Sequence, residues 1–295
     1  VLIVSSTTNK LLPFLPMPLI QILLGIGIGL CLPNNQYHLD TELFLALVIG
    51  PLLFREAQGA DVTSILKHWK IVLYLIFPVI FVSTLSMGGL AHVLWIGLPL
   101  AACVAVGAAL GPTDLVAFTS LSERFTFPKR ISNILKGEGL LNDASGLIAF
   151  RVALIAWTTG TFSITQAGIS LAISIVGGLA VGLMTALINR FLHSFLLSVR
   201  ATDIASELLL DLSLPLLTFF IAEGIHVSGI IAVVVAGILK ASRFKKINLL
   251  EAQVDTVTET VWHTVTFMLN GSVFVILGME LEMIAEPILK SAFYN

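Results

Sequence analysis

One ionisable side chain, Asp114, interrupts a long apolar stretch of this chain in the run Gly-Pro-Thr-Asp, residues 111–114. Proline removes a backbone N–H donor and clashes with the preceding turn, and glycine loosens the backbone, so we expect a helix to break there. The freed carbonyl groups can coordinate a cation, and the N-terminus of a second half-helix favours an anion such as Asp114. The alternative is a plain kink, in which Thr113 and Asp114 cap the second half-helix.

A second polar group lies in the next apolar stretch and contains Glu138, Asn142 and Asp143. Glu138 and Asn142 are four residues apart and share one face of a helix, and Asp143 is adjacent to Asn142. A carboxylate beside an amide can accept either a proton or a small hard cation, because such cations prefer oxygen ligands. Na⁺ and H⁺ would then compete at Asp143, with Thr113 as a second candidate ligand of Na⁺. The alternative is a polar cluster in the entry turn of the helix, which neighbouring helices satisfy.

Arg151 follows Asp143 on the same expected helix. Eight residues separate the two, roughly 12 Å at about 1.5 Å per residue, so Arg151 must find its partner on another helix. A structural ion pair and a pathway charge are both open for Arg151. We expect Glu223 and His226 to lie in a surface turn at an outer helix end. Asn270-Gly271 is expected to interrupt the last apolar stretch.

The elements that position these residues are membrane spans. Hydrophobic residues make up 57% of the 295 residues and charged residues only 12%, with a mean hydropathy of +0.99. Soluble proteins carry about 25% charged residues, and apolar stretches of about 20 residues cross a bilayer. The sequence therefore predicts an all-α polytopic bundle of about ten spans with at least one broken helix. The expected spans are 1–9, 14–32, 41–54, 70–91, 94–121, 130–157, 165–190, 205–222, 227–240 and 256–280.

The basic residues support this count. All of the 16 Lys and Arg residues except Arg151 and Lys290 fall on one set of alternate loops, which the positive-inside rule places in the cytoplasm. The net charge of −2 indicates no nucleic-acid surface. No phosphate-binding loop, nucleophile elbow or zinc motif is present in the sequence, so we expect neither an enzyme nor a cofactor.

We interpret residues 1–295 as one transmembrane domain of a longer protein, truncated at both ends. The chain opens on Val1 with a shortened apolar stretch and stops at Asn295, just after another expected span. A weak inverted repeat would need a partner beyond Asn295.

Several stretches resemble the sodium/hydrogen exchanger superfamily, and specifically its bacterial NhaP-like branch of monovalent cation:proton antiporters. The stretches are 111–117, 137–143 and 225–237, supported by 51–54 and 269–278, in the same order. The resemblance implies an inverted-repeat fold with an ion-translocating core and a dimerisation domain, and a homodimer in the lipid bilayer of the cell membrane.

The resemblance also implies residue roles. Asp143 would be the ion-binding carboxylate and Asn142 its neighbour, with Thr113 and Asp114 in the broken helix beside them. Glu138 matches a glutamate that an arginine of a later helix usually holds, and that arginine would lie beyond Asn295. The chain departs from the family pattern at three positions, namely Arg55, Leu115 in place of a proline, and Gly139 in place of a serine.

The function that follows is exchange of Na⁺, or K⁺ or Li⁺, for H⁺ by competition at a membrane-buried carboxylate. Two alternatives stay open at this stage. One is a truncated inactive remnant or structural membrane subunit, and the other is a transporter of another solute.

Overall fold

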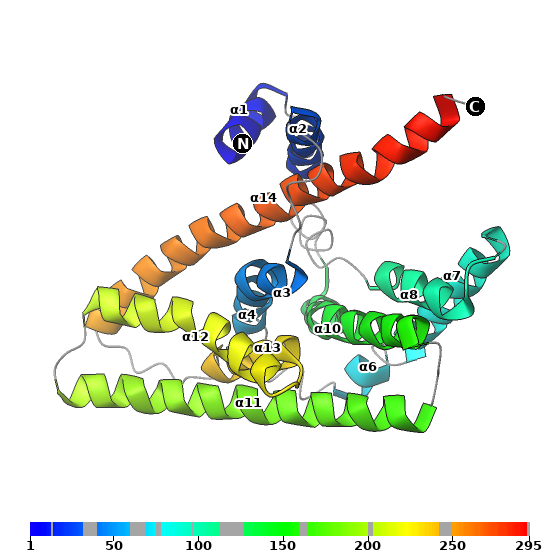
Figure 1. The fold of residues 1–295 in the computed structure, drawn as a ribbon. Helices are drawn as coiled ribbons and strands as arrows, with labels where there is room; N and C mark the ends of the chain where they lie inside the picture. The colour runs from blue at the N-terminus through cyan, green and yellow to red at the C-terminus, as the bar shows by residue number, and fades with distance from the viewer. Residues whose placement is uncertain are drawn as a thin grey trace. The chain divides into compact units, whose positions relative to one another are not determined.

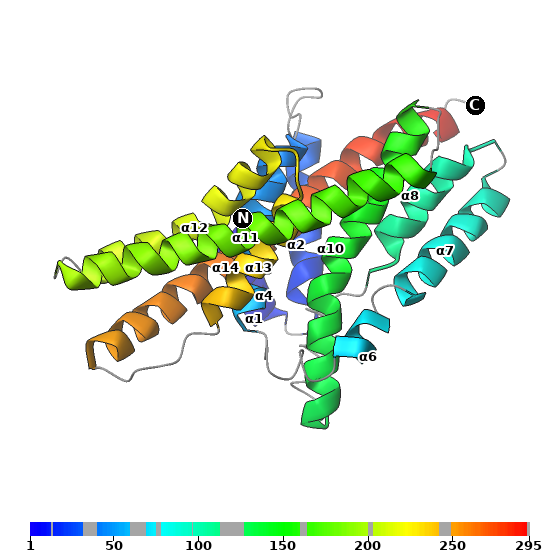
Figure 2. The ribbon, with the colours of Figure 1, turned by 90° about the horizontal axis from the view of Figure 1, so that it is seen from below.

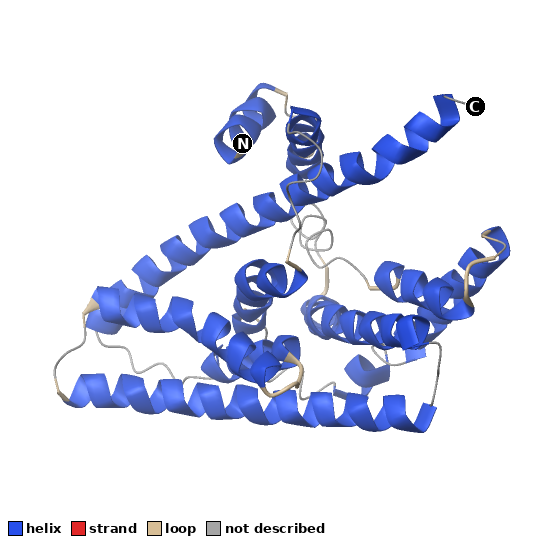
Figure 3. Cartoon of the chain, viewed as in Figure 1, coloured by secondary structure: helices blue, strands red, loops and turns tan. Residues whose placement is uncertain are grey.

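A computed structural model shows that the described residues form helices joined by turns, with no strand among them (Figure 3). This confirms the expected all-α class. The structure describes residues 1–12, 14–31, 40–59, 69–74, 78–95, 97–112, 127–159, 164–199, 203–241 and 249–293.

The helices, drawn in Figure 1, overlap all ten expected spans. Their bounds are α1 Leu2–Leu11, α2 Met17–Cys31, α3 Thr41–Phe44, the π-helical η1 Leu45–Ile49, α4 Gly50–Gln58, α6 Trp69–Tyr74, α7 Ile80–Leu94, α8 Leu100–Leu110, α10 Lys129–Thr159, α11 Ile164–Ser198, α12 Ile204–Gly224, α13 Gly229–Ala241 and α14 Leu249–Phe293. Within the described residues, three helical stretches are long and apolar enough to cross a membrane: Ala172–Ser198, Ile204–Gly224 and Thr256–Leu281. Shorter apolar helices, including α2, α8 and α13, accompany them.

The structure corrects the sequence-based prediction at two places. Helix α7 continues to Leu94, and the turn to α8 follows it, where Gly97 adopts a φ of 111° that favours glycine and Pro99 precedes the first residue of α8. The turn therefore lies several residues later than the expected boundary between 91 and 94. Helix α14 runs without interruption through Asn270-Gly271, and Gly271 lies where the Leu2 and Gln21 side chains approach the helix closely.

The chain divides into two compact units, each described by itself. The first comprises Val1–Leu52, Ile204–Leu208 and Lys246–Asn295, and the second comprises Leu53–Asp203 and Leu209–Lys245. In the first unit α2 packs along α14, and their backbones approach closely where Gly25 meets Gly278. Small residues allow such approach in membrane helices, where lipid supplies no hydrophobic drive for association.

The second unit contains every candidate site residue. Helices α7 and α8 form an antiparallel pair, α8 packs on α10, and α13 lies along α11 (Figure 2). Glycines again mark the contacts, since Gly107 of α8 meets the backbone of Thr84 and Gly88, and Gly178 and Gly182 of α11 meet α13. Gly229 of α13 likewise faces Phe219, and Gly237 faces Phe54 and Ala57.

Candidate functional site

The expected helix break coincides with the end of α8. The helix ends at Leu110, and Gly111 and Pro112 follow it outside any helix. Pro112 has no N–H to donate, so the carbonyl group of Ala108 loses its usual helical donor. Thr113 and Asp114, the two polar residues of the break, lie outside the described residues.

Helix α10 packs directly against this break. A Cβ at Gly146 would overlap Cγ of Pro112 and would lie 3.5 Å from the carbonyl oxygen of Ala108. The freed carbonyl therefore faces α10 at a position where α10 has no side chain. Asn142 and Asp143 belong to the same helix, although their side chains lie outside the description. Position 143 is three residues before Gly146, so the two positions are neighbours along one side of α10.

Glu138 lies further back on α10. The helix begins at Lys129, so Glu138 is in its third turn and not in an entry turn. Its side chain is buried, with 7% of the residue exposed. Burial of an ionisable residue within a bundle is expensive and marks it as a functional or structural group.

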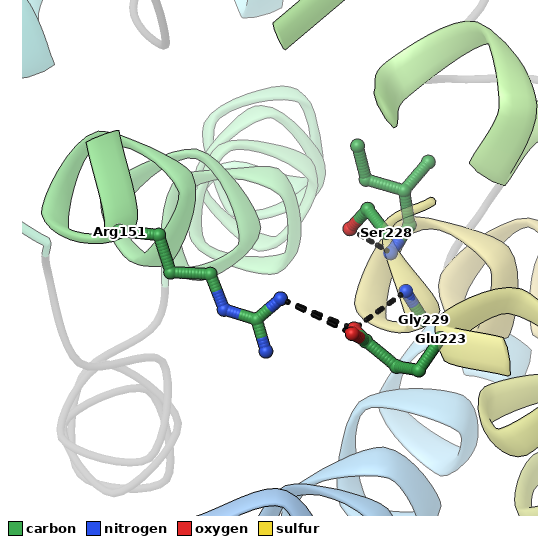
Figure 4. A network of polar contacts seen from close by, with 5 residues as sticks. Arg151, Glu223, Ser228 and Gly229 are labelled. Atoms are coloured by element: carbon green, nitrogen blue, oxygen red, sulfur yellow. Dashed lines mark hydrogen bonds and ion pairs between the residues drawn. The ribbon is translucent and has the colours of Figure 1, made fainter. Parts of the chain in front are cut away.

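The partner of Arg151 is Glu223, at the end of α12 (Figure 4). Arg151 Nη1 donates hydrogen bonds to Glu223 Oε1 at 3.2 Å and to Oε2 at 3.4 Å. The expectation of a partner on another helix is confirmed. Glu223 Oε1 also accepts a hydrogen bond of 3.1 Å from the N–H of Gly229, the first residue of α13. A carboxylate at a helix N-terminus satisfies an orphan donor and complements the helix dipole.

The surroundings of Glu223 differ in part from the expected surface turn. Residues 224–226 are exposed, as predicted, but the Glu223 side chain is only 16% exposed and joins α10, α12 and α13. The expected surface turn is therefore present at residues 224–226, while the Glu223 side chain turns back towards Arg151 and the start of α13.

A second ion pair was not recognised from the sequence. Asp211 of α12, with 4% of the residue exposed, pairs with Lys240 of α13. Gln58 Nε2 donates to Asp211 Oδ1 at 3.5 Å, and Arg55 Nη1 donates to Gln58 Oε1 at 3.0 Å. The available signal was Asp211 itself, an ionisable residue inside the expected span 205–222. Lys240 gave no signal, because its position suggested a cytoplasmic loop.

Comparison with known proteins decides the family. The sequence profile described as "Sodium/hydrogen exchanger, transmembrane" matches residues 1–293. This chain belongs to that family. It is therefore a membrane protein, and the resemblance drawn from its motifs is confirmed.

Relatives of this exchanger family member include named antiporters. It is 36% identical over 291 residues to a sodium, potassium, lithium and rubidium/H⁺ antiporter of Bacillus pumilus, covering 99% of this chain and 43% of the relative. It is 32% identical to an uncharacterised Na⁺/H⁺ exchanger of Escherichia coli, YjcE, covering 98% of this chain and 53% of the relative. The chain thus spans about half the length of these relatives or less.

A solved structure supports the fold of this family member. The sodium proton antiporter MjNhaP1 of Methanocaldococcus jannaschii aligns with a TM-score of 0.68 at 21% identity, covering 94% of this chain and 68% of that one. At this identity the likeness shows a common helical fold. Within the described residues no group of three or more His, Cys, Asp or Glu side chains is arranged to hold a metal ion.

The Gly146 contact gives a first prediction. If the function is the cation-dependent proton exchange that we propose below, we expect Gly146→Ala to lower its rate at least about tenfold, because shifting a reacting geometry by about 1 Å can cost a hundredfold in rate. The added Cβ would push Pro112 away from α10. The measurement is the exchange rate in membrane vesicles, normalised to the amount of inserted protein. Gly89→Ala is the matched control, because nothing lies within 4 Å of a Cβ there. Equal activity of both variants would contradict the prediction.

The turn that follows Glu223 gives a second prediction. His226 has a φ of 60°, in the left-handed region, while its N–H donates to the Glu223 carbonyl group at 2.9 Å. Because this conformation costs a residue with a Cβ roughly 1–2 kcal/mol, we expect His226→Gly to raise the free energy of unfolding by about 1 kcal/mol. Thermal unfolding in detergent measures the change. Ile225→Gly, where φ is not positive, should give no such gain; a gain at both positions would refute the explanation.

Proposed function

We propose that the natural polypeptide containing this sequence exchanges Na⁺, or K⁺ or Li⁺, for H⁺ across the cell membrane by alternating access. The observation that carries the proposal is the packing of Gly146 in α10 against Pro112 at the end of α8. Position 143 lies three residues before Gly146 on α10, so this packing supports a place for Asp143 close to the helix break and its freed carbonyl group. The family membership and the names of the relatives support the same function.

The chemistry is competition at one carboxylate. In one state Asp143 would lose a proton and bind a monovalent cation, with Asn142, Thr113 and Asp114 supplying further oxygen atoms. Motion of the core would then expose the loaded site to the other side of the membrane. A carboxylate carries either a proton or a cation and remains compensated in both states, so a membrane-buried charge is avoided throughout the cycle. The cycle uses the ion gradients and needs neither ATP nor a cofactor.

The supporting charges would hold the site in shape. Arg151 and Glu223 tie α10 to the α12–α13 turn, and the buried Glu138 would anchor the earlier part of α10 to an arginine of a later span. The basic loops would face the cytoplasm, and the protein would form a homodimer through a dimerisation domain.

The test is cation-induced proton movement in everted membrane vesicles. A preformed proton gradient, acid inside, is followed with a fluorescent amine while NaCl, KCl or LiCl is added. The natural full-length polypeptide should dissipate the gradient with at least one of these salts, and choline chloride should not. Vesicles from cells that lack the protein are the control. No response to any monovalent cation from correctly inserted protein would refute the function and favour an inactive or structural membrane subunit.

A further inference from the structure

One buried hydroxyl group of α7 has no hydrogen-bond partner. Thr84 is 6% exposed, and its Oγ1 is buried without a donor or acceptor within reach among the described residues. A helical threonine normally bonds the carbonyl group one turn earlier. Leaving a buried hydroxyl unsatisfied costs stability, so such a group in a native structure calls for an explanation.

The Thr84 hydroxyl faces the helix break. The position that a Cβ would take at Gly111 lies 3.4 Å from Thr84 Oγ1, 3.1 Å from Ser83 Oγ and 3.2 Å from the carbonyl oxygen of Gly107. Three oxygen atoms thus surround the point at which a side chain of residue 111 would begin. Two come from α7, and the third comes from the last turn of α8, the end of the helix that favours cations.

The α7–α8 contact fixes these oxygen atoms in place. A Cβ at Gly107 would overlap the carbonyl oxygen of Thr84, and a Cβ at Gly88 would lie 3.0 Å from the Cys103 carbonyl oxygen. The two backbones therefore touch at Thr84 and again one turn further along α7, and Thr84 cannot move away from Gly111 without separating the helices. Prearranged oxygen atoms replace the hydration shell of an ion at low cost.

We propose that Thr84 is a ligand of the transported monovalent cation, in an oxygen-lined site beside Gly111 that Ser83 Oγ and the Gly107 carbonyl group complete. The proposal rests on the proposed exchange function and adds α7 to the ion pathway. Hydroxyl and carbonyl oxygens suit small hard cations such as Na⁺ and Li⁺, and they offer no anion or organic substrate a counter-charge. The Thr84 hydroxyl has no hydrogen-bond partner among the described residues, so both lone pairs of its oxygen are available to such an ion.

The decisive comparison is Thr84→Val against Thr84→Ser in the full-length protein, reconstituted in proteoliposomes. Valine keeps the shape of threonine and removes the hydroxyl, whereas serine keeps the hydroxyl. Since one interaction with a charged group is lost, we expect Thr84→Val to raise the half-saturating Na⁺ concentration about tenfold. The maximal rate should change little, and Thr84→Ser should stay close to wild type. Thr84→Val should also leave thermal stability in Na⁺-free buffer unchanged or higher, because it removes an unsatisfied group.

Thr185→Val is the matched control. Thr185 is 7% exposed in the same unit, but its hydroxyl donates to the Val181 carbonyl oxygen at 3.0 Å and accepts from Thr218 at 3.0 Å. This variant should lose stability and keep the wild-type half-saturating concentration. The opposite behaviour of two equally buried threonines separates ion binding from packing.

Two results would overturn the proposal. One is an unchanged half-saturating Na⁺ concentration in Thr84→Val. The other is an equal loss of transport rate in the Val and Ser variants at all Na⁺ concentrations. That result would mean that Thr84 has a packing role or binds a structural water. Na⁺-induced thermal stabilisation in detergent separates this test from that of the exchange function. Suppose that the wild type shows no transport, and that Na⁺ stabilises the wild type but not Thr84→Val. That result would support the cation site and refute the exchange function. If the wild type neither transports a monovalent cation nor is stabilised by Na⁺, both proposals fail; if it transports but Na⁺ stabilises Thr84→Val as much as the wild type, only the Thr84 site fails.

Discussion

Replacing Asp143 with Asn should abolish cation-dependent proton exchange. An amide neither takes up a proton in this pH range nor carries the negative charge that holds a cation, so both halves of the competition are lost. Removing a group that transfers a proton typically costs at least about a hundredfold, so we expect a drop of about two orders of magnitude or more. The measurement is gradient dissipation by Na⁺, K⁺ and Li⁺ in everted vesicles with equal amounts of inserted protein.

The control for Asp143→Asn is the same carboxylate-to-amide change elsewhere. Glu259 is exposed on α14, and Glu259→Gln should keep wild-type exchange. Substantial exchange by Asp143→Asn at any of several pH values would show that the carboxylate of the ion site is another residue. Asp114 would then become the first candidate, because it follows the break that α10 packs against.

The sequence predicted the parts of this site that depend on local chemistry. Gly111 and Pro112 weaken a helix wherever they occur together, and α8 ends just before them. The run from Lys129 to Thr159 is helical almost as predicted, which fixes the spacing of Glu138, Asp143 and Gly146 along one helix. The apolar length of each stretch gave the helix positions, since bilayer thickness sets a narrow range of span lengths.

Tertiary pairing could not be predicted in the same way. Arg151 had to find a partner on another helix, but nothing local distinguishes Glu223 from other acidic residues as that partner. The Asp211–Lys240 pair depends on α13 continuing to Ala241 and on α12 lying beside it. Thr84 resembles any threonine in an apolar helix until α8 is placed against α7. Each of these depends on how helices pack, and hydropathy carries no information on packing partners.

Breaking the Asp211–Lys240 pair should be strongly destabilising. Asp211 is buried in α12, and the Lys240 side chain is only 17% exposed. Removing one partner of a buried pair leaves an uncompensated charge, which costs about 3–5 kcal/mol. We therefore expect Lys240→Met and Asp211→Leu each to lower the unfolding temperature clearly in detergent. The double variant should recover most of the loss, because no charge is then left unpaired.

The Arg151–Glu223 pair is the matched control for this second prediction. The Arg151 side chain is 43% exposed, so water screens the pair, and Arg151→Met should cost about 1 kcal/mol or less. A loss for Lys240→Met no larger than for Arg151→Met would contradict the prediction. It would mean that water reaches Asp211, and that α13 is held mainly by its backbone contacts with Gly178 and Gly182 of α11. A large loss that the double variant repairs would instead make Asp211 and Lys240 the electrostatic link between α12 and α13.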